Sequence, residues 1–209
     1  MLGIHHYGVF LATGILLNLT PGQDTLYIVG RSVAHGRTIG VASALGVSTG
    51  GLVHTVGAAL GLSALLATSA SAFAALKWLG AAYLIYLGLR MVVGSAKAPG
   101  SDDRPRTAAA WVAFRQGILT NVTNPKVALF FLAFLPQFID PAAPGKVLAF
   151  LLLGATFLVT GTVWCLILAL AAGSFRALLS PGSRGARLLP RATGVVFVLL
   201  GLRVATSKA

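Results

Sequence analysis

The chain has 209 residues, of which 56% are hydrophobic and only 10% charged, and its mean hydropathy is +0.87. Soluble globular domains carry about 25% charged residues, so this composition excludes a soluble domain and indicates an integral membrane protein. The net charge of +12 comes from 16 Lys and Arg residues against four acids. These basic residues lie mainly between apolar segments, which favours a role in membrane orientation over nucleic-acid binding.

Six apolar stretches are long enough to cross a bilayer, which takes about 18 to 20 residues. In chain order they are 7–30, 39–67, 72–94, 114–138, 147–173 and 188–206. The first stretch has no Lys or Arg before it and no clean small-residue cleavage site, so we expect a retained helix rather than a signal peptide.

A hydrophilic connection between Gly94 and Thr107 divides the six stretches into three plus three. We therefore expect an all-α integral membrane protein with one transport domain, 1–209. It would comprise a three-helix repeat at 1–95, a cytoplasmic linker at 96–112 and a second repeat at 113–209. Because three is an odd number, a duplicated half enters the membrane in the opposite sense, which predicts an inverted repeat.

The first and fourth stretches are interrupted by similar polar motifs, Asn18-Leu19-Thr20-Pro21-Gly22-Gln23-Asp24 and Asn121-Val122-Thr123-Asn124-Pro125-Lys126. A proline within a helix removes a backbone donor and frees carbonyl groups that lipid cannot satisfy. Breaks at matching positions of two halves are typical of a midplane binding site made of half-helix ends. The sequence therefore predicts a small transporter whose helices break at Pro21, Gly22 and Pro125.

Each break carries one ionisable residue into an apolar span. Asp24 is the only acid within a span, and Lys126 lies about 18 Å of helix rise from either end of its own span. An unpaired charge at this depth is costly, so we expect the two to be partners. They would form a structural salt bridge, or bind the ammonium of a zwitterionic ligand at Asp24 and its carboxylate at Lys126.

Several other residues near the breaks allow more than one interpretation. Asn18, Asn121 and Asn124 could coordinate substrate or cap freed backbone groups. Tyr27, one turn after Asp24, could support the carboxylate, line the path or pack in the core. Cys165, the single cysteine, and the aromatic Trp164 need only packing or interfacial roles; one cysteine excludes an internal disulfide and offers no metal-ligand spacing.

His54 shares one helix stripe with Gly46 and Gly50 at four-residue spacing. Small residues at this spacing allow two helices to approach closely, either within one chain or across a homodimer. An interface histidine is the simpler interpretation of His54, and a proton relay is the alternative.

The distribution of Lys and Arg predicts the orientation. One side holds eleven: Arg31, Arg37, Arg90, Lys97, Arg104, Arg106, Arg115, Arg176, Arg184, Arg187 and Arg191. The other holds Lys77, Lys146, Arg203 and Lys208. Both termini are therefore expected outside the cytoplasm.

These motifs resemble the LysE/RhtB family of bacterial amino-acid exporters over essentially the whole chain. The similarity rests on Thr20-Pro21-Gly22-Gln23-Asp24-Thr25-Leu26, Arg31-Ser32, Gly36-Arg37, Gly40, Leu45-Gly46, Gly50, His54, Asn121, Asn124-Pro125-Lys126 and Phe134-Leu135-Pro136-Gln137-Phe138. The resemblance implies a six-helix inner-membrane exporter of amino acids or close derivatives, driven by the proton motive force without a cofactor. Gln23 stands where the family commonly has a second proline, which could alter the local unwinding and the substrate preference.

Two other classes of protein fit single features of the sequence. Gly46-Val47-Ser48-Thr49-Gly50 matches the pattern of a serine hydrolase, but that motif needs a strand-to-helix turn and here lies within an apolar helix. A metal exporter would need several converging ligands, and the spans offer only Asp24, His54 and Cys165.

A lining with one charge of each sign favours a small neutral amino acid such as threonine, homoserine or leucine. The expected partners are therefore this substrate, the lipid bilayer and, as an open possibility, a second copy of the chain.

Overall fold

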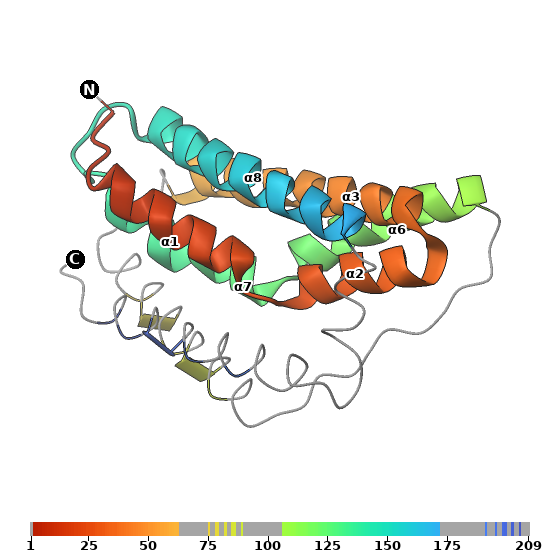
Figure 1. Cartoon of the computed structure of the whole chain (residues 1–209). Coiled ribbons are helices and arrows are strands. Elements are labelled where there is room, and N and C mark those ends of the chain that lie inside the picture. Colours follow the sequence, from red (N-terminus) through yellow and green to blue (C-terminus); the bar gives the residue numbers. More distant parts are fainter. Residues whose placement is uncertain are drawn as a thin grey trace.

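The computed structural model describes residues 2–62 and 106–171, with isolated positions between 75 and 89 and between 191 and 205. Within these residues every regular element is helical, and one isolated antiparallel bridge joins Ile4 to Ile139 (Figure 1). The all-helical expectation is confirmed there. The spans expected at 72–94 and 188–206 lie outside the two described ranges, and the inverted repeat stays a prediction.

The first span is broken, as predicted, into two helices. Helix α1 covers Tyr7–Leu19 and helix α2 covers Gln23–His35. Thr20, Pro21 and Gly22 between them are not helical. Helix α2 runs to His35, beyond the expected end at 30, and stops at Gly36, whose φ of +89° is a conformation that glycine adopts without strain.

Helices α3 (Arg37–Gly57) and α8 (Lys146–Leu170) correspond to the spans expected at 39–67 and 147–173. Helix α3 continues into a π-helical turn, Ala58–Leu62. Both are long and apolar enough to cross a membrane.

The second broken span comprises helix α6 (Arg106–Val122) and helix α7 (Pro125–Leu129). A π-helical turn, Phe130–Phe134, and a 3-10 turn, Leu135–Phe138, extend it. The two parts bend by 44° at the break, and counting them as one span gives up to three membrane-crossing candidates among the described residues. Helix α6 begins before the expected 114, because its first turns follow the linker without a helix-breaking residue after Pro105.

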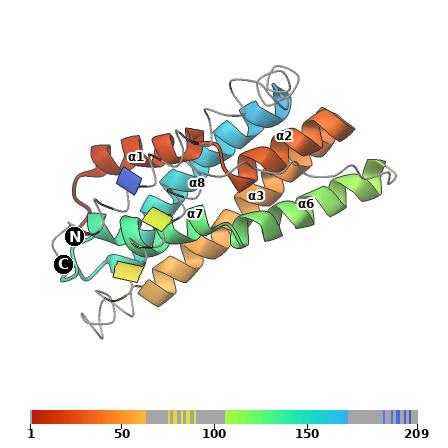
Figure 2. The same ribbon diagram turned by 90° about the horizontal axis from the view of Figure 1, so that it is seen from below.

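The two broken helices run in opposite directions, with both breaks near the middle of the molecule (Figures 1 and 2). Helices α3 and α8 pack together and against them. Around α1 and α7 the core is aromatic, with Phe10, Phe130, Phe131, Phe134, Phe138, Phe150 and Phe157 in one buried cluster. The aromatic rings fill the interior around α1 and α7, and the polar residues lie next to this cluster, at the two breaks.

The glycine stripe of α3 packs against α6 within the same chain. A Cβ placed on Gly46 would collide with the backbone of Phe114, and one placed on Gly50 would lie 2.7 Å from the carbonyl oxygen of Ile118. Gly117 faces this stripe from α6, where a Cβ would lie 2.6 Å from the carbonyl oxygen of Ser43. Small residues on both helices therefore bring the backbone of α3 next to the break in α6.

Candidate functional site

Pro21 deprives the carbonyl of Leu17 of its usual partner, because an α-helical carbonyl accepts from the N–H four residues later and proline has none. Lys126 supplies the missing donor. Its Nζ lies 2.9 Å from the carbonyl oxygen of Leu17 and 2.7 Å from that of Thr20. The side chain is only 8% exposed, and a Cβ on Gly22 would lie 3.4 Å from Nζ, so the lysine is packed into the first break.

Pro125 has the same effect on the carbonyl of Asn121 in the second break. His54 Nε2 lies 3.1 Å from that oxygen, and the N–H of Asn124 donates to it at 2.9 Å. Because a carbonyl can only accept, His54 carries its proton on Nε2. Its ring stacks on Phe131 with 5.8 Å between centroids. His54 therefore lies at the interface between α3 and the break in α6, in agreement with the simpler of its two interpretations.

Asp24 and Lys126 do not form the expected salt bridge in this structure. Asp24 Oδ2 accepts instead from Asn121 Nδ2 at 2.8 Å, and Lys126 is bound to the two carbonyls of the first break. Lys126 binds the carbonyls of Leu17 and Thr20 because these oxygens have no other hydrogen-bond donor among the described residues of the apolar interior. The breaks are thus linked reciprocally: α7 supplies a cation to α1, and α6 supplies an amide to α2.

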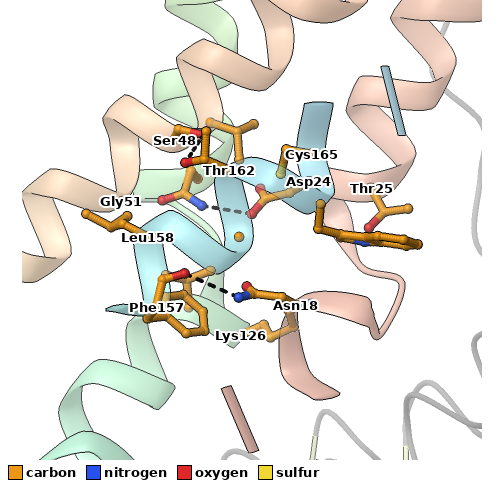
Figure 3. Close-up of a pocket in the computed structure, with 15 residues that line it drawn as sticks. Asn18, Asp24, Thr25, Ser48, Gly51, Lys126, Phe157, Leu158, Thr162 and Cys165 are labelled. Atoms are coloured by element: carbon orange, nitrogen blue, oxygen red, sulfur yellow. Dashed lines mark hydrogen bonds between the residues drawn. The ribbon is translucent and has the colours of Figure 1, made fainter. Parts of the chain in front are cut away.

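These groups surround one cavity of about 50 Å³, which gives room for a few water molecules (Figure 3). The polar or sulfur-bearing side chains that line it are Asn18, Asp24, Thr25, Ser48, Asn121, Lys126, Thr162, Trp164 and Cys165. Asp24 Oδ1 and Asn121 Oδ1 are buried and find no hydrogen-bond donor among the described residues. Two residues of the cavity wall, Asp24 and Asn121, therefore each keep one buried oxygen without a donor, and the side-chain nitrogen of Asn124 is buried without an acceptor in the same part of the chain.

Four of the predicted site residues thus meet at the cavity: Asn18, Asp24, Asn121 and Lys126. Asn18 also joins α1 to α8, since its Nδ2 donates to the carbonyl of Phe157 and to Thr160 Oγ1.

The other predicted side chains do not line this cavity. Gln23 is exposed at the start of α2. The Tyr27 hydroxyl donates to the carbonyl of Ala113 at 2.6 Å, which joins α2 to α6. Asn124 caps α7, because its Oδ1 accepts from the N–H of Lys126 at 3.0 Å, and His54 faces the second break from α3. Asn124 therefore fits the capping alternative.

Sequence reasoning missed Ser48, Thr162, Trp164 and Cys165 as cavity residues. Thr162 Oγ1 donates to Ser48 Oγ at 2.9 Å, and Ser48 Oγ donates to the carbonyl of Ala44. Ser48 lies in the continuous helix α3, which contradicts a strained hydrolase turn. The series of hydroxyls in the fifth span, Thr156, Thr160 and Thr162, is the signal that could have found Thr162, because an apolar helix does not need them.

No group of three or more His, Cys, Asp or Glu side chains converges in the part of the chain that the structure describes. Nothing there favours a metal site.

Two broken helices that meet at a cavity with several polar side chains in its wall, in an apolar, helical chain, are typical of a membrane transporter. Residues 15–208 match the model of the LysE type translocator family, and the chain belongs to that family.

Relatives match almost the whole chain. A homoserine/homoserine lactone efflux protein of Salmonella typhimurium is 35% identical over 202 residues, which are 95% of each chain. The protein of the same name in Salmonella typhi is 34% identical over 95% of each chain. An uncharacterized membrane protein of Vibrio cholerae is 32% identical over 99% of each chain. No solved structure matches the chain at a significant level.

Proposed function

We propose that this protein exports small neutral amino acids and close derivatives, of the homoserine, threonine or leucine type, from the cytoplasm. The observation that carries the proposal is a pair of buried oxygens without a hydrogen-bond donor among the described residues, Asp24 Oδ1 and Asn121 Oδ1, on two residues that line the cavity. A substrate ammonium has three N–H donors and one positive charge, so it complements this pair. The names of the Salmonella relatives, which cover an amino acid and its lactone, support the substrate type.

The wall of the cavity supports a substrate with a polar side chain. The Ser48 hydroxyl donates to the carbonyl of Ala44, and the Thr162 hydroxyl donates to Ser48 Oγ, so both hydroxyls can only accept further hydrogen bonds. A hydroxyl on the substrate would donate to them. The third N–H of Lys126 is available to a substrate carboxylate, since two carbonyls take the other two.

The transport cycle would be alternating access powered by the proton motive force, in a bacterial inner membrane with both termini outside the cytoplasm. Protonation of Asp24 from the outside would weaken its hold on the ammonium and release the substrate outward. Loss of the proton to the cytoplasm would restore the site. Since about 50 Å³ is too small for a whole amino acid, the helices around the breaks must move to admit one.

Export by cells that carry preloaded, labelled amino acids tests this proposal. We expect a subset of small neutral amino acids to leave rapidly, and a protonophore to slow their export. Asp24→Asn should reduce export about tenfold or more, the cost of losing a charge-assisted hydrogen bond of about 1.5 to 3 kcal/mol.

Asp140→Asn is the matched control, because Asp140 is exposed and lies far along the chain from both breaks. It should export at the parental rate. If Asp24→Asn is expressed normally and keeps the parental rate and pH dependence, Asp24 has no part in binding or coupling. If no amino acid in the panel is exported by the parental protein, the substrate class is wrong.

A further inference from the structure

We infer that Leu158 limits the size of the substrate side chain that the cavity admits, and that Gly51 opposite provides the space which Leu158 fills. Leu158 is then a specificity-determining residue of the transporter. The inference rests on the proposed function, because it concerns which amino acids the same cavity accepts.

Leu158 of α8 and Gly51 of α3 lie side by side in the cavity wall (Figure 3). A Cβ placed on Gly51 would collide with Leu158 Cδ2, so the end of the leucine side chain packs directly on the backbone of α3. The same Cβ position lies 3.8 Å from Oδ1 of Asn121, the residue that binds Asp24. Leu158 therefore fills space next to the polar part of the cavity, and a shorter side chain would leave that space to a substrate.

Contacts on both sides of this pair fix the distance between α3 and α8. One turn before Leu158, a Cβ on Gly154 would collide with the side chain of Thr55. One turn after it, Thr162 Oγ1 donates to Ser48 Oγ at 2.9 Å. Because the two helices already touch at both places, they have little freedom to close over the space that a shorter residue at this position would leave.

The polar groups of the cavity determine where a substrate side chain would lie. Asp24, Asn121 and Lys126 come from α2, α6 and α7, and the proposed function assigns the ammonium and the carboxylate of the substrate to them. Helices α3 and α8 form much of the remaining wall, so the side chain of a bound amino acid would lie against these two helices. Leu158 would then limit the length of that side chain.

Phe157, the neighbouring apolar residue of the wall, has a different role. Its ring stacks on Phe130 with 4.4 Å between centroids and meets Phe131 edge to face at 5.6 Å. It is 5% exposed, whereas Leu158 is only partly buried. A shorter residue in place of Phe157 would disturb the aromatic cluster, whereas one in place of Leu158 changes mainly the wall of the cavity.

The selectivity of a Leu158→Ala variant tests the inference. The assay is uptake into everted membrane vesicles of two labelled amino acids at low concentration: a small neutral one that the parental protein transports, and phenylalanine. The ratio of the phenylalanine rate to the rate of the small amino acid should rise at least about tenfold, the discrimination that one methylene gives in an apolar pocket. A merely structural role of Leu158 would slow both substrates by the same factor. An unchanged ratio would therefore overturn the inference.

Two further variants separate the filling of this space from an effect on stability. Gly51→Ala in the Leu158→Ala background puts a methyl group into the emptied space, so the ratio should return towards the parental value. Leu152→Ala is the matched control, because Leu152 is 44% exposed on the same helix and should leave the ratio unchanged. A double variant that is as permissive as Leu158→Ala, or a control that raises the ratio equally, would contradict the role assigned to Leu158.

Failure of the inference can be told from failure of the proposed function. If parental vesicles take up no small neutral amino acid, the proposed function and the inference both fail. If they do take one up and Leu158→Ala keeps the parental ratio, the exporter proposal stands and the inference fails. If Leu158→Ala is not expressed, or takes up neither amino acid, Leu158→Val decides the question. It removes a single carbon and should also raise the ratio, and an unchanged ratio would again overturn the inference.

Discussion

At the scale of single residues, the site follows from two missing N–H groups. Pro21 removes the helical N–H partner of the Leu17 carbonyl, and Pro125 removes that of the Asn121 carbonyl, which also accepts from the N–H of Asn124. In each case a basic side chain from a different helix donates to the freed oxygen: Lys126 in the first break and His54 in the second. Each proline thus interrupts its own helix and frees a backbone carbonyl. That carbonyl accepts a hydrogen bond from a side chain of another helix.

His54 can be tested as a cap or as a proton relay with two substitutions. His54→Gln keeps an N–H donor but does not titrate, whereas His54→Phe keeps a ring to stack on Phe131 but cannot donate. If His54 is a cap, the glutamine variant should export at a rate near the parental one, and the phenylalanine variant should lose about 1 kcal/mol of stability.

The measurements are export rate against pH and thermal unfolding in detergent. Loss of proton-dependent export in both variants, with unfolding temperatures unchanged, would support the relay and contradict the cap.

At the scale of helices, the crossing of α3 and α6 fixes where the second break lies. At Gly50 a Cβ would stand 2.7 Å from the Ile118 carbonyl oxygen and 2.8 Å from Asn121 Cβ. These distances are shorter than ordinary van der Waals contact. The same crossing carries Asn121 to Asp24, so the packing of two helices controls the geometry of the site.

Gly50→Ala and Gly57→Ala make a matched pair on α3. Alanine at Gly50 should destabilise the protein by roughly 1 to 3 kcal/mol, because the helices must separate. A Cβ at Gly57 would meet nothing within 4 Å, so alanine there should be neutral or stabilise by up to about 1 kcal/mol through helix propensity.

Thermal unfolding and export rate of both purified variants check this expectation. Equal unfolding temperatures would mean that the close crossing of α3 and α6 does not exist in the membrane.

At the scale of the whole molecule, the two broken helices run in opposite directions (Figure 2). Their breaks are joined by hydrogen bonds from Lys126 to the Leu17 carbonyl and from Asn121 to Asp24. The turn between α2 and α3 and the loop at 139–145 lie at opposite ends of the described part (Figure 1). A membrane normal along this axis would put the basic turn, with Arg31 and Arg37, on one side and the loop on the other.

Single cysteines in a Cys165→Ser background test the proposed orientation. Ala142 and Thr38 are both exposed, one in the loop at 139–145 and the other at the start of α3. Ala142→Cys should react with a membrane-impermeant maleimide in intact spheroplasts, and Thr38→Cys only after permeabilisation. The opposite labelling pattern would put the termini in the cytoplasm.

Much of the fold could be predicted because its causes are local in sequence. The breaks at Pro21 and Pro125 come from prolines, which interrupt a helix in any surroundings. Span lengths come from the thickness of the bilayer, and the ionisable pair stood out against apolar neighbours. The partner of Lys126 could not be predicted, because it depends on which groups of α1 face α7 after packing.

The sequence by itself therefore determined the class of protein, the two breaks and the presence of Asp24 and Lys126 at them. Only the tertiary structure decided that Lys126 binds carbonyls, that Asp24 pairs with Asn121, and that Ser48 and Thr162 reach the same cavity. The physical reason is that proline and hydropathy act on a segment alone. Hydrogen-bond partners in a membrane protein depend instead on the rotation of each helix against its neighbours, which side-chain packing sets.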